Sequence, residues 1–375
     1  MQHKAGLNIS DLCCIVSCAV PTAHSNRDVP VSVTRFRFQP LSLVSVFFFF
    51  HVVIIFLEEY IYTFENLSLL FRNVFTFDTS HYILQFNMAA TTILVVGATG
   101  KQGGQVMATL LNSGRSQISL RFLTRNKSSP NATELISKGA TAVVGNLSDR
   151  QLLLTALKGV DRAYLVTDAG AGEEKEAELG INFVEAAKEA GVSHMVLSSV
   201  SAADLAKDVP HFRSKATVER SLQASGMSYT ILRPVAFMDN FPVAPGFARF
   251  MVVGMFYAAI GGRKCQLISV KDIGTFGGMA LLDPDSSHFH NAILDLSGGN
   301  YDISDVRHAV YAAQGGGQPW FATYTPKLVR RLLPYDFRQM MIYLERVGYP
   351  DIDTAKLREI YPDLMTLEQY FRQDL

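Results

Sequence analysis

From residue 92 onward, short apolar runs rich in β-branched residues alternate with longer segments whose apolar residues recur at helical spacing. Such runs suit strands buried on both faces of a parallel sheet, and the amphipathic segments suit helices that cover it. The expected strands are 92–96, 118–125, 140–147, 160–167, 193–200 and 228–234. The expected helices are 104–114, 148–159, 173–191 and 213–226. This alternation predicts an α/β fold with a doubly wound parallel sheet of Rossmann type, whose ligand lies at the carboxyl ends of the strands.

After Pro234 the alternation loosens, and segments 237–258, 287–299 and 315–334 mix short strands, loops and helices. We expect residues 88–234 to form a dinucleotide-binding core and residues 235–375 to form mostly a smaller, C-terminal, substrate-side lobe. A final helix is expected within residues 361–373, with Thr366 as its N-cap.

The chain before residue 88 differs from the rest in composition. Residues 1–87 hold twelve of the 25 phenylalanines, and residues 41–57 are apolar except for a few small polar residues and His51. One interpretation is a short membrane anchor. A secretory signal fits less well, because the apolar run starts late and no small-residue cleavage pattern follows. The third interpretation, which we favour, is that this segment is not part of the working protein, because translated noncoding sequence with T-rich codons would have this composition. We therefore expect Met88 to open the functional protein.

Charge and cysteine content exclude several classes. Basic and acidic residues number 34 each, so the net charge is zero and gives no global attraction to nucleic acid or anionic membrane. Of the four cysteines, only Cys265 lies beyond residue 87, which excludes a disulfide framework there and indicates a reducing compartment. Neither CxxC nor HExxH spacing occurs, so we expect no metal site.

A glycine pattern lies between the first expected strand and the first expected helix. Gly97, Gly100 and Gly103 form G-x-x-G-x-x-G within "TTILVVGATGKQGG". A dinucleotide needs a tight turn, exposed backbone N–H groups and close approach of its pyrophosphate to a helix N-terminus at this point. A tight turn alone would explain isolated glycines, but the strand and helix on either side favour dinucleotide binding.

The second expected strand ends near Arg125, where an NAD-preferring site carries an acid that accepts the ribose hydroxyls. No acid occurs between Gly104 and Glu134, and Arg125 and Lys127 stand there instead. Either they are solvated surface charges or they bind a 2′-phosphate. Their position after this strand favours the phosphate, and hence NADP.

From Met88 to Leu375 the chain resembles the NmrA-like family of atypical short-chain dehydrogenases. The resemblance rests on "VVGATGKQGG", "LTRN", "VLSSVS", "HFRSKATVE", "ILRPVAFMDNF", "ISVKDIG" and "YPDLMTLEQYF", which occur in this order. It implies a Rossmann-type domain that binds a dinucleotide, usually NADP. Family members divide into reductases of small carbonyl, quinone or phenolic compounds and NADP-binding redox sensors or transcription co-regulators.

The resemblance also implies which residues contact the cofactor. It implies that the pyrophosphate loop is Gly97, Ala98, Thr99, Gly100, Lys101, Gln102 and Gly103, and that the 2′-phosphate contacts are Arg125, Asn126 and Lys127. It implies cofactor contacts at the ends of the third and fourth strands from Asn146, Leu147, Thr167 and Asp168. On the nicotinamide side it implies Lys215, Phe237, Met238, Asp239 and Asn240. Asn146 stands where many relatives have Asp, which puts one adenine hydrogen bond in doubt.

The sequence offers two candidates for a catalytic group, Lys215 and His211. Short-chain dehydrogenases commonly use Tyr-x-x-x-Lys, whose two side chains share a helix face, but here the pattern is His211-x-x-x-Lys215. Lys215 either acts as acid or base beside the nicotinamide or only binds the ribose. His211 is a weaker candidate for the proton donor. Ser198, Ser199 and Ser201 follow the fifth strand, where the dehydrogenase serine would lie, but serines are common there.

Two further features have a functional and a packing interpretation. The "FMDN" segment can close on the nicotinamide with Asn240 as its polar contact, whereas Phe237 and Met238 also suit a core. Trp320, beside Gly315–Gly317, can line a substrate pocket, but a single tryptophan more often fills a core.

Two function classes therefore remain. The first, which we favour, is an NADP-dependent oxidoreductase acting on a small carbonyl, enone or quinone. The second is an NADP-sensing regulator that binds a protein partner, such as a GATA-type transcription factor, without catalysis. We expect no direct nucleic-acid binding, since no DNA-binding motif occurs. We expect a cytoplasmic or nuclear location, with no membrane contact unless residues 41–57 are an anchor.

Overall fold

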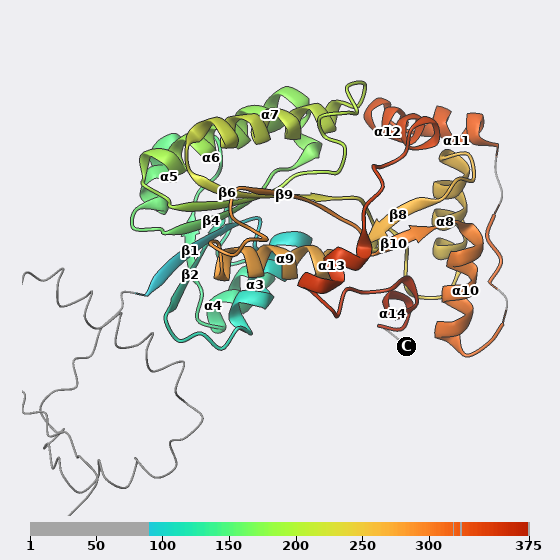
Figure 1. The fold of residues 1–375 in the computed structure, drawn as a ribbon, viewed down its shortest axis with the longest axis horizontal. Helices are drawn as coiled ribbons and strands as arrows, with labels where there is room; N and C mark the ends of the chain where they lie inside the picture. The colour runs from blue at the N-terminus through green and yellow to red at the C-terminus, as the bar shows by residue number, and fades with distance from the viewer. Residues whose placement is uncertain (1–89, 318, 323–324, 374–375) are drawn as a thin grey trace, which may run out of the picture. The chain divides into compact units, whose positions relative to one another are not determined.

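The computed structural model describes residues 90–317, 319–322 and 325–373. Its main feature is a seven-stranded sheet in the order β3-β2-β1-β4-β5-β6-β9, in which every pairing is parallel (Figure 1). The chain order reverses between β1 and β4, so the carboxyl end of β1 adjoins the topological switch point. The strands are β1 (Thr91–Val96), β2 (Ile118–Thr124), β3 (Thr141–Val144), β4 (Arg162–Val166), β5 (His194–Ser198), β6 (Ser228–Pro234) and β9 (Ala292–Leu296). The predicted doubly wound parallel sheet is confirmed.

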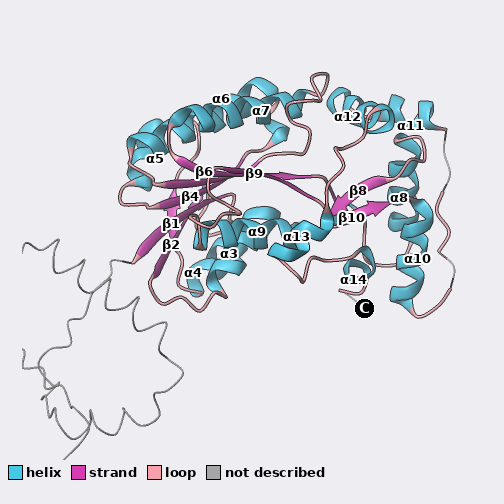
Figure 2. Ribbon diagram, in the orientation of Figure 1, coloured by secondary structure: helices cyan, strands magenta, loops and turns pink. Residues whose placement is uncertain are grey.

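Helices cover both faces of this sheet (Figure 2). One layer consists of α5 (Arg150–Leu157), α6 (Glu173–Glu189) and α7 (Pro210–Ser225). The other consists of α3 (Lys101–Leu111), α4 (Pro130–Ser137), α9 (Val270–Leu282) and α13 (Thr354–Ile360). Successive β1 residues supply both cores: Ile93 packs in the cluster with α3 and α9, and Leu94 packs in the cluster with α5 and α6. This alternation is what a strand buried on both faces requires.

Glycines let α9 lie very close to α3. A Cβ at Gly274 would stand 2.2 Å from Gln105 Cβ, and one at Gly278 would stand 2.5 Å from Thr109 Cγ2. Neither distance is possible between real side chains, so a larger residue would force the two helices apart. The "GTFGG" sequence of α9 therefore sets its close packing on α3.

The remaining elements form a smaller lobe. Its three-stranded sheet has the order β10-β8-β7, and its helices share a separate apolar core that includes Val253, Phe321 and Phe371. The elements are β7 (Ala236–Phe237), β8 (Cys265–Ile268), β10 (Gly299–Tyr301), α8 (Phe247–Ala259), α10 (Ile303–Gln314), α11 (Pro326–Leu332), α12 (Tyr335–Arg346) and α14 (Leu367–Phe371). Short 3₁₀ turns occur at η4 (Ala169–Ala171) and η5 (Met238–Asn240).

The lobe is not continuous in the sequence. α9 and β9 follow residue 234, yet α9 packs on α3 and β9 pairs with β6 at the edge of the main sheet. α4 was not expected from the sequence, and α7 begins at Pro210 rather than at the expected residue 213. Thr366 caps α14 as predicted, by accepting a hydrogen bond from the Gln369 N–H.

No helix among the described residues is long and apolar enough to cross a membrane. The expectations for residues 1–87, including the alternative of an anchor at 41–57, lie outside the described residues.

Candidate functional site

The predicted glycine loop joins β1 to α3. Gly97 has a φ of 75°, and a Cβ there would stand 2.5 Å from Val166 Cγ1. A Cβ at Gly103 would stand 2.4 Å from the Gly97 carbonyl oxygen. The first glycine is therefore required by its backbone conformation and the third by close packing of the helix against the turn. Both are the roles that glycines have in a dinucleotide-binding turn.

The N-terminus of α3 is open to an anion. Its N-cap is Gly100, which makes no side-chain cap, no side chain in the described part of the chain accepts a hydrogen bond from the first-turn amides, and the first turn contains no acid. Unpaired amides and the positive end of the helix dipole favour a phosphate at such a helix start.

A cavity of about 510 Å³ opens beside this loop, at the carboxyl ends of β1 to β4 and the first turns of α6. Eight of the residues implied by the family resemblance line it. These are Gly97, Thr99, Arg125, Asn126, Asn146, Leu147, Thr167 and Asp168. The other lining residues were not expected from the sequence; they are Val96, Leu123, Thr124, Ser129, Gly145, Ser148, Val166, Ala171, Lys175, Glu176 and Leu179.

Three side chains fold the loops at the rim of this cavity. Asn126 accepts a hydrogen bond from the Ser128 N–H at 2.9 Å, Asn146 from the Ser148 N–H at 2.9 Å, and Asp168 from the Gly170 N–H at 2.9 Å. Each stands just after a strand and accepts from the amide two residues on, which is an Asx turn. The amide of Asn146 therefore shapes its own loop, as an aspartate would.

Arg125 is exposed at the cavity wall, directly after β2. Asp168 and Glu176 are the acids that line the cavity, and neither stands on the β2 loop. Lys127 is exposed but does not line the cavity. Arg125 is thus the basic residue that follows β2 and lines this part of the cavity, and its guanidinium offers several donors in a planar fork.

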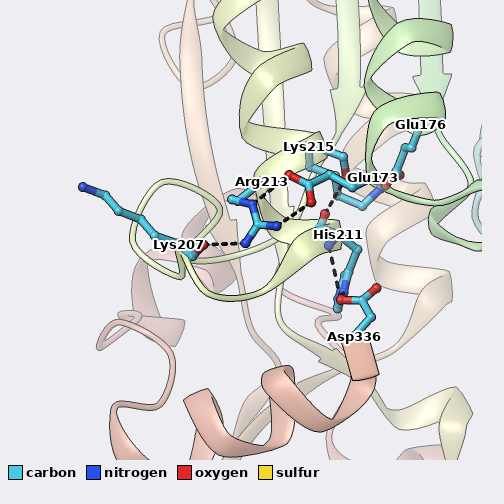
Figure 3. A network of polar contacts seen from close by, with 8 residues as sticks. Glu173, Glu176, Lys207, His211, Arg213, Lys215 and Asp336 are labelled. Atoms are coloured by element: carbon cyan, nitrogen blue, oxygen red, sulfur yellow. Dashed lines mark hydrogen bonds and ion pairs between the residues drawn. The ribbon is translucent and has the colours of Figure 1, made fainter. Parts of the chain in front are cut away.

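Lys215, on α7, reaches the cavity wall through two residues that line it. Its Nζ lies 2.8 Å from Glu176 Oε1 (Figure 3). It also lies 3.2 Å from Thr167 Oγ1. The Lys215 side chain is 11% exposed and that of Glu176 is fully buried. The structure therefore brings Lys215 to Thr167, two residues that the resemblance assigns to the cofactor, and adds the carboxylate of Glu176, which was not expected from the sequence; Lys215 itself does not line the cavity.

His211 is engaged elsewhere. Its Nδ1 lies 2.6 Å from Asp336 Oδ1 on α12, and its ring contacts Phe212 and Phe337 (Figure 3). It does not line the cavity. The structure therefore does not bring His211 to the candidate site, although it lies one helical turn before Lys215.

The "FMDN" segment also lies away from this cavity. Met238 is fully buried in the core of the lobe, and Phe237 packs against the core beneath α9. Asp239 accepts a hydrogen bond from the Val270 N–H at 2.8 Å, at the start of α9. Asn240 is exposed. The contacts of Phe237, Met238 and Asp239 agree with the packing interpretation of this segment.

The remaining residues of the predicted pyrophosphate loop contribute to the structure of the turn. Ala98 is buried, and Gln102 accepts a hydrogen bond from Ser198 Oγ at 2.6 Å. These two residues, with Gly100, Lys101 and Gly103, do not line the cavity. Contact of Lys101 and the first-turn amides with a cofactor stays a prediction.

The serines after β5 have structural partners in two of three cases. Ser198 binds Gln102, and Ser201 donates to Asp295 Oδ1 at 2.6 Å, whereas the buried Ser199 hydroxyl has no hydrogen-bond partner among the described residues. Trp320 is 71% exposed and stacks on Phe250, so it does not fill a core. Within the described part of the chain, no group of three or more His, Cys, Asp or Glu side chains could hold a metal ion.

A glycine turn between a central strand and a helix, an open helix N-terminus and a cavity at the switch point define a Rossmann-type dinucleotide-binding protein. Residues 89–371 match the NmrA-like family, and the chain belongs to that family. The resemblance found in the sequence is confirmed.

Individual relatives agree with this assignment. The chain is 31% identical over 192 residues to an NAD(P)H azoreductase of Xenophilus azovorans, which covers 51% of this chain and 64% of that protein, less than two thirds of its length. The triphenylmethane reductase of Citrobacter sp., solved with NADP(H), has a TM-score of 0.61 at 19% identity, covering 76% of this chain and all of that one. NmrA, a negative transcriptional regulator solved with NADP, has a TM-score of 0.59 at 18% identity, covering 76% and 95%.

Proposed function

We propose that this chain is an NADP(H)-dependent oxidoreductase that reduces a small carbonyl, enone or quinone compound. The observation that carries the proposal is the cavity at the switch point, which is lined by Gly97 and Thr99 of the loop that leads into α3 and by Arg125. Relatives described as NAD(P)H-dependent reductases and fold neighbours solved with NADP(H) support the cofactor and the reaction class.

The residues of the chain have distinct roles in this proposal. The first-turn amides of α3 bind the pyrophosphate, and Arg125 binds the 2′-phosphate. NADPH, when bound, supplies a hydride. Lys215 holds the nicotinamide ribose and donates a proton or hydrogen bond toward the substrate oxygen, because its Nζ stands beside Thr167 and Glu176 at the cavity wall.

The experiment that tests this function measures NADPH consumption against a panel of carbonyl, enone and quinone compounds, with NADP(H) and NAD(H) affinities measured in parallel by calorimetry. We expect NADPH to bind more tightly than NADH and at least one panel compound to be reduced. Absence of NADP(H) binding would contradict the proposal as a whole.

A second candidate is an NADP-sensing regulator that binds a protein partner and does not turn over its cofactor. One observation favours it: the position of the usual catalytic tyrosine holds His211, whose Nδ1 pairs with Asp336 and which does not line the cavity. NmrA itself is described as a transcriptional regulator. Micromolar NADP binding with no turnover on any panel compound would favour this candidate over the enzyme.

A further inference from the structure

Glu176 is a buried acid to which the proposed function gives no role. It lies in the first turns of α6, and its side chain is fully buried at the cavity wall. Oε1 accepts hydrogen bonds from Thr167 Oγ1 at 2.7 Å and from Lys215 Nζ at 2.8 Å, and Oε2 accepts one from Ser214 Oγ. Three polar groups therefore face the carboxyl group, and the Ser214 hydroxyl also lies 3.0 Å from the His211 carbonyl oxygen.

Close packing of α6 against α7 brings Glu176 to its hydrogen-bond partners. One turn farther along both helices, a Cβ at Gly180 would stand 2.4 Å from Val218 Cγ2, so α6 and α7 approach as closely as only glycine allows. On the other side of Glu176, Arg213 of α7 pairs with Glu173 of α6 (Figure 3). The close contact at Gly180 sets how α6 lies on α7, so that Glu176 faces Ser214 and Lys215, and the partly exposed Arg213–Glu173 pair lies beside this contact.

The contact limits what Lys215 can do. An ammonium has three donors and no acceptor. Among the described residues, two of these donors have partners, Glu176 and Thr167. One N–H remains for a ligand, and its direction is set because both partners are buried.

We propose that Glu176 is a positioning residue that holds the Lys215 ammonium against Thr167 at the cavity wall, so that its remaining N–H is aimed at the bound dinucleotide. This inference rests on the proposed function, because it takes NADP(H) as the ligand. Glu176 itself stays paired with Thr167, Ser214 and Lys215 and acts through Lys215. Buried ion pairs contribute little net stability but break at high cost when one partner is removed, which suits a positioning role.

The test is a double-mutant cycle read out as NADPH affinity, measured by calorimetry on the full chain. Glu176→Gln keeps the size of the side chain and removes its charge, and Lys215→Met removes the ammonium. Each change alone is expected to weaken NADPH binding at least about tenfold, the cost of losing a well-placed hydrogen bond to a charged group. Glu176→Gln in the Lys215→Met background is expected to cause no further loss.

Unfolding provides a second readout. Lys215→Met leaves a buried carboxylate without its cation, so adding Glu176→Gln should raise the melting temperature of the Lys215→Met protein. Glu173→Gln is the matched control, because it breaks the neighbouring α6–α7 ion pair without touching Lys215. It should leave NADPH affinity unchanged. If Glu176→Gln fails to fold, Glu176→Asp, which keeps the charge but withdraws it by one methylene, takes its place in the cycle with the same expected result.

The outcomes separate this inference from the proposed function. Additive losses in the cycle, or equal losses for Glu173→Gln and Glu176→Gln, would show that Glu176 only supports the fold, and would overturn the positioning role while leaving NADP(H) binding intact. Failure of the parent protein to bind NADP(H) would overturn both.

Discussion

We expect Arg125 to decide the preference between NADP and NAD because of where the backbone places it. The residue follows the last residue of β2 and stands at the cavity wall, exposed, with no acid on its loop. A guanidinium at this position can form charge-assisted hydrogen bonds with a 2′-phosphate, whereas NAD offers only hydroxyl groups there.

Replacing Arg125 by alanine should therefore weaken NADP binding by about ten- to a hundredfold and leave NAD binding nearly unchanged, given about 1.5–3 kcal/mol for a hydrogen bond to a charged group. Calorimetry with both dinucleotides measures the effect. Arg121→Ala is the control, since Arg121 stands on the same strand but donates to the Lys158 carbonyl and does not line the cavity. Equal NADP and NAD affinities in the parent protein would refute the role of Arg125.

Lys215 can be tested by separating binding from turnover. A lysine that only holds the ribose predicts that Lys215→Ala recovers most turnover at saturating NADPH. A lysine that delivers a proton predicts a loss of about 10²–10⁴ in kcat even at saturation. Lys215→Arg keeps the charge but cannot readily release a proton, so we expect it to retain binding and lose turnover. Full kcat in the arginine variant would assign Lys215 to binding alone.

At this scale the sequence predicts some residues of the site and misses others for a physical reason. Gly97, Arg125 and Asp168 were predictable because each belongs to a local turn after a strand. Glu176 was not, because within "EEKEAE" it resembles its solvated neighbours and only the packing of α7 buries it. The partner of His211 lies 125 residues away, and no local pattern indicates such a contact.

At the scale of elements, the pair α3 and α9 joins the glycine-loop helix to a helix from the second half of the chain. The pairing depends on Gly274 and Gly278, which allow the helix backbones to approach. The helix that follows the glycine loop, and with it the loop itself, is therefore supported by α9.

Gly274→Ala should lower the free energy of unfolding by about 1–3 kcal/mol, the usual cost of overpacking, even though alanine favours a helix over glycine by about 1 kcal/mol. The new methyl group would meet Gln105 Cβ and the backbone of α3. Urea denaturation measures the change. Lys271→Ala, at an exposed position of the same helix, should have little effect. Unchanged stability of Gly274→Ala would mean that the helices separate at no cost.

Elements with strong local signals were predictable. The first six strands of the sheet were expected close to their observed positions, because apolar runs and flanking turns mark them. α4 was missed although Ser129 and Pro130 form a typical helix start, because the helix has only eight residues and buries only Ala132. β9 was not assigned, since a short edge strand is defined by its pairing with β6 rather than by its own pattern.

For the whole molecule, the buried His194 couples stability to pH. It lies at the start of β5, with its ring nitrogens 2.9 Å from Ser228 Oγ and 3.1 Å from Thr230 Oγ1. Burial, with a smaller contribution from the nearby Arg162, lowers the pKa of His194 to about 4 from its usual 6.5. The folded protein therefore keeps this ring neutral at pH values where the unfolded chain has already bound a proton.

Because the unfolded state binds the extra proton, the stability is lost as pH falls from about 6.5 to about 4, by up to about 3 kcal/mol at 1.36 kcal/mol per pKa unit. His194→Gln, which keeps a polar side chain beside both hydroxyls, should flatten this dependence. Urea denaturation between pH 4 and pH 8 is the measurement, with the exposed His288→Gln as control. An equally steep loss of stability in His194→Gln would assign the effect to other groups.

The main sheet and the helices that cover it include elements from both halves of the chain, and this has a consequence for synthesis on the ribosome. When a nascent chain has emerged only as far as residue 260, six strands of the sheet are available, but α9 and β9 are not. Val106 of α3 and Tyr164 of β4, which are both fully buried in the finished protein, then lack the helix α9 that covers them. Exposed apolar faces of this kind are what chaperones bind and what drives aggregation of incomplete chains. The dinucleotide-binding half of the protein therefore completes its core only after much of the second half has been translated. A ribosome that stalls near residue 260 would release an aggregation-prone fragment rather than a folded domain.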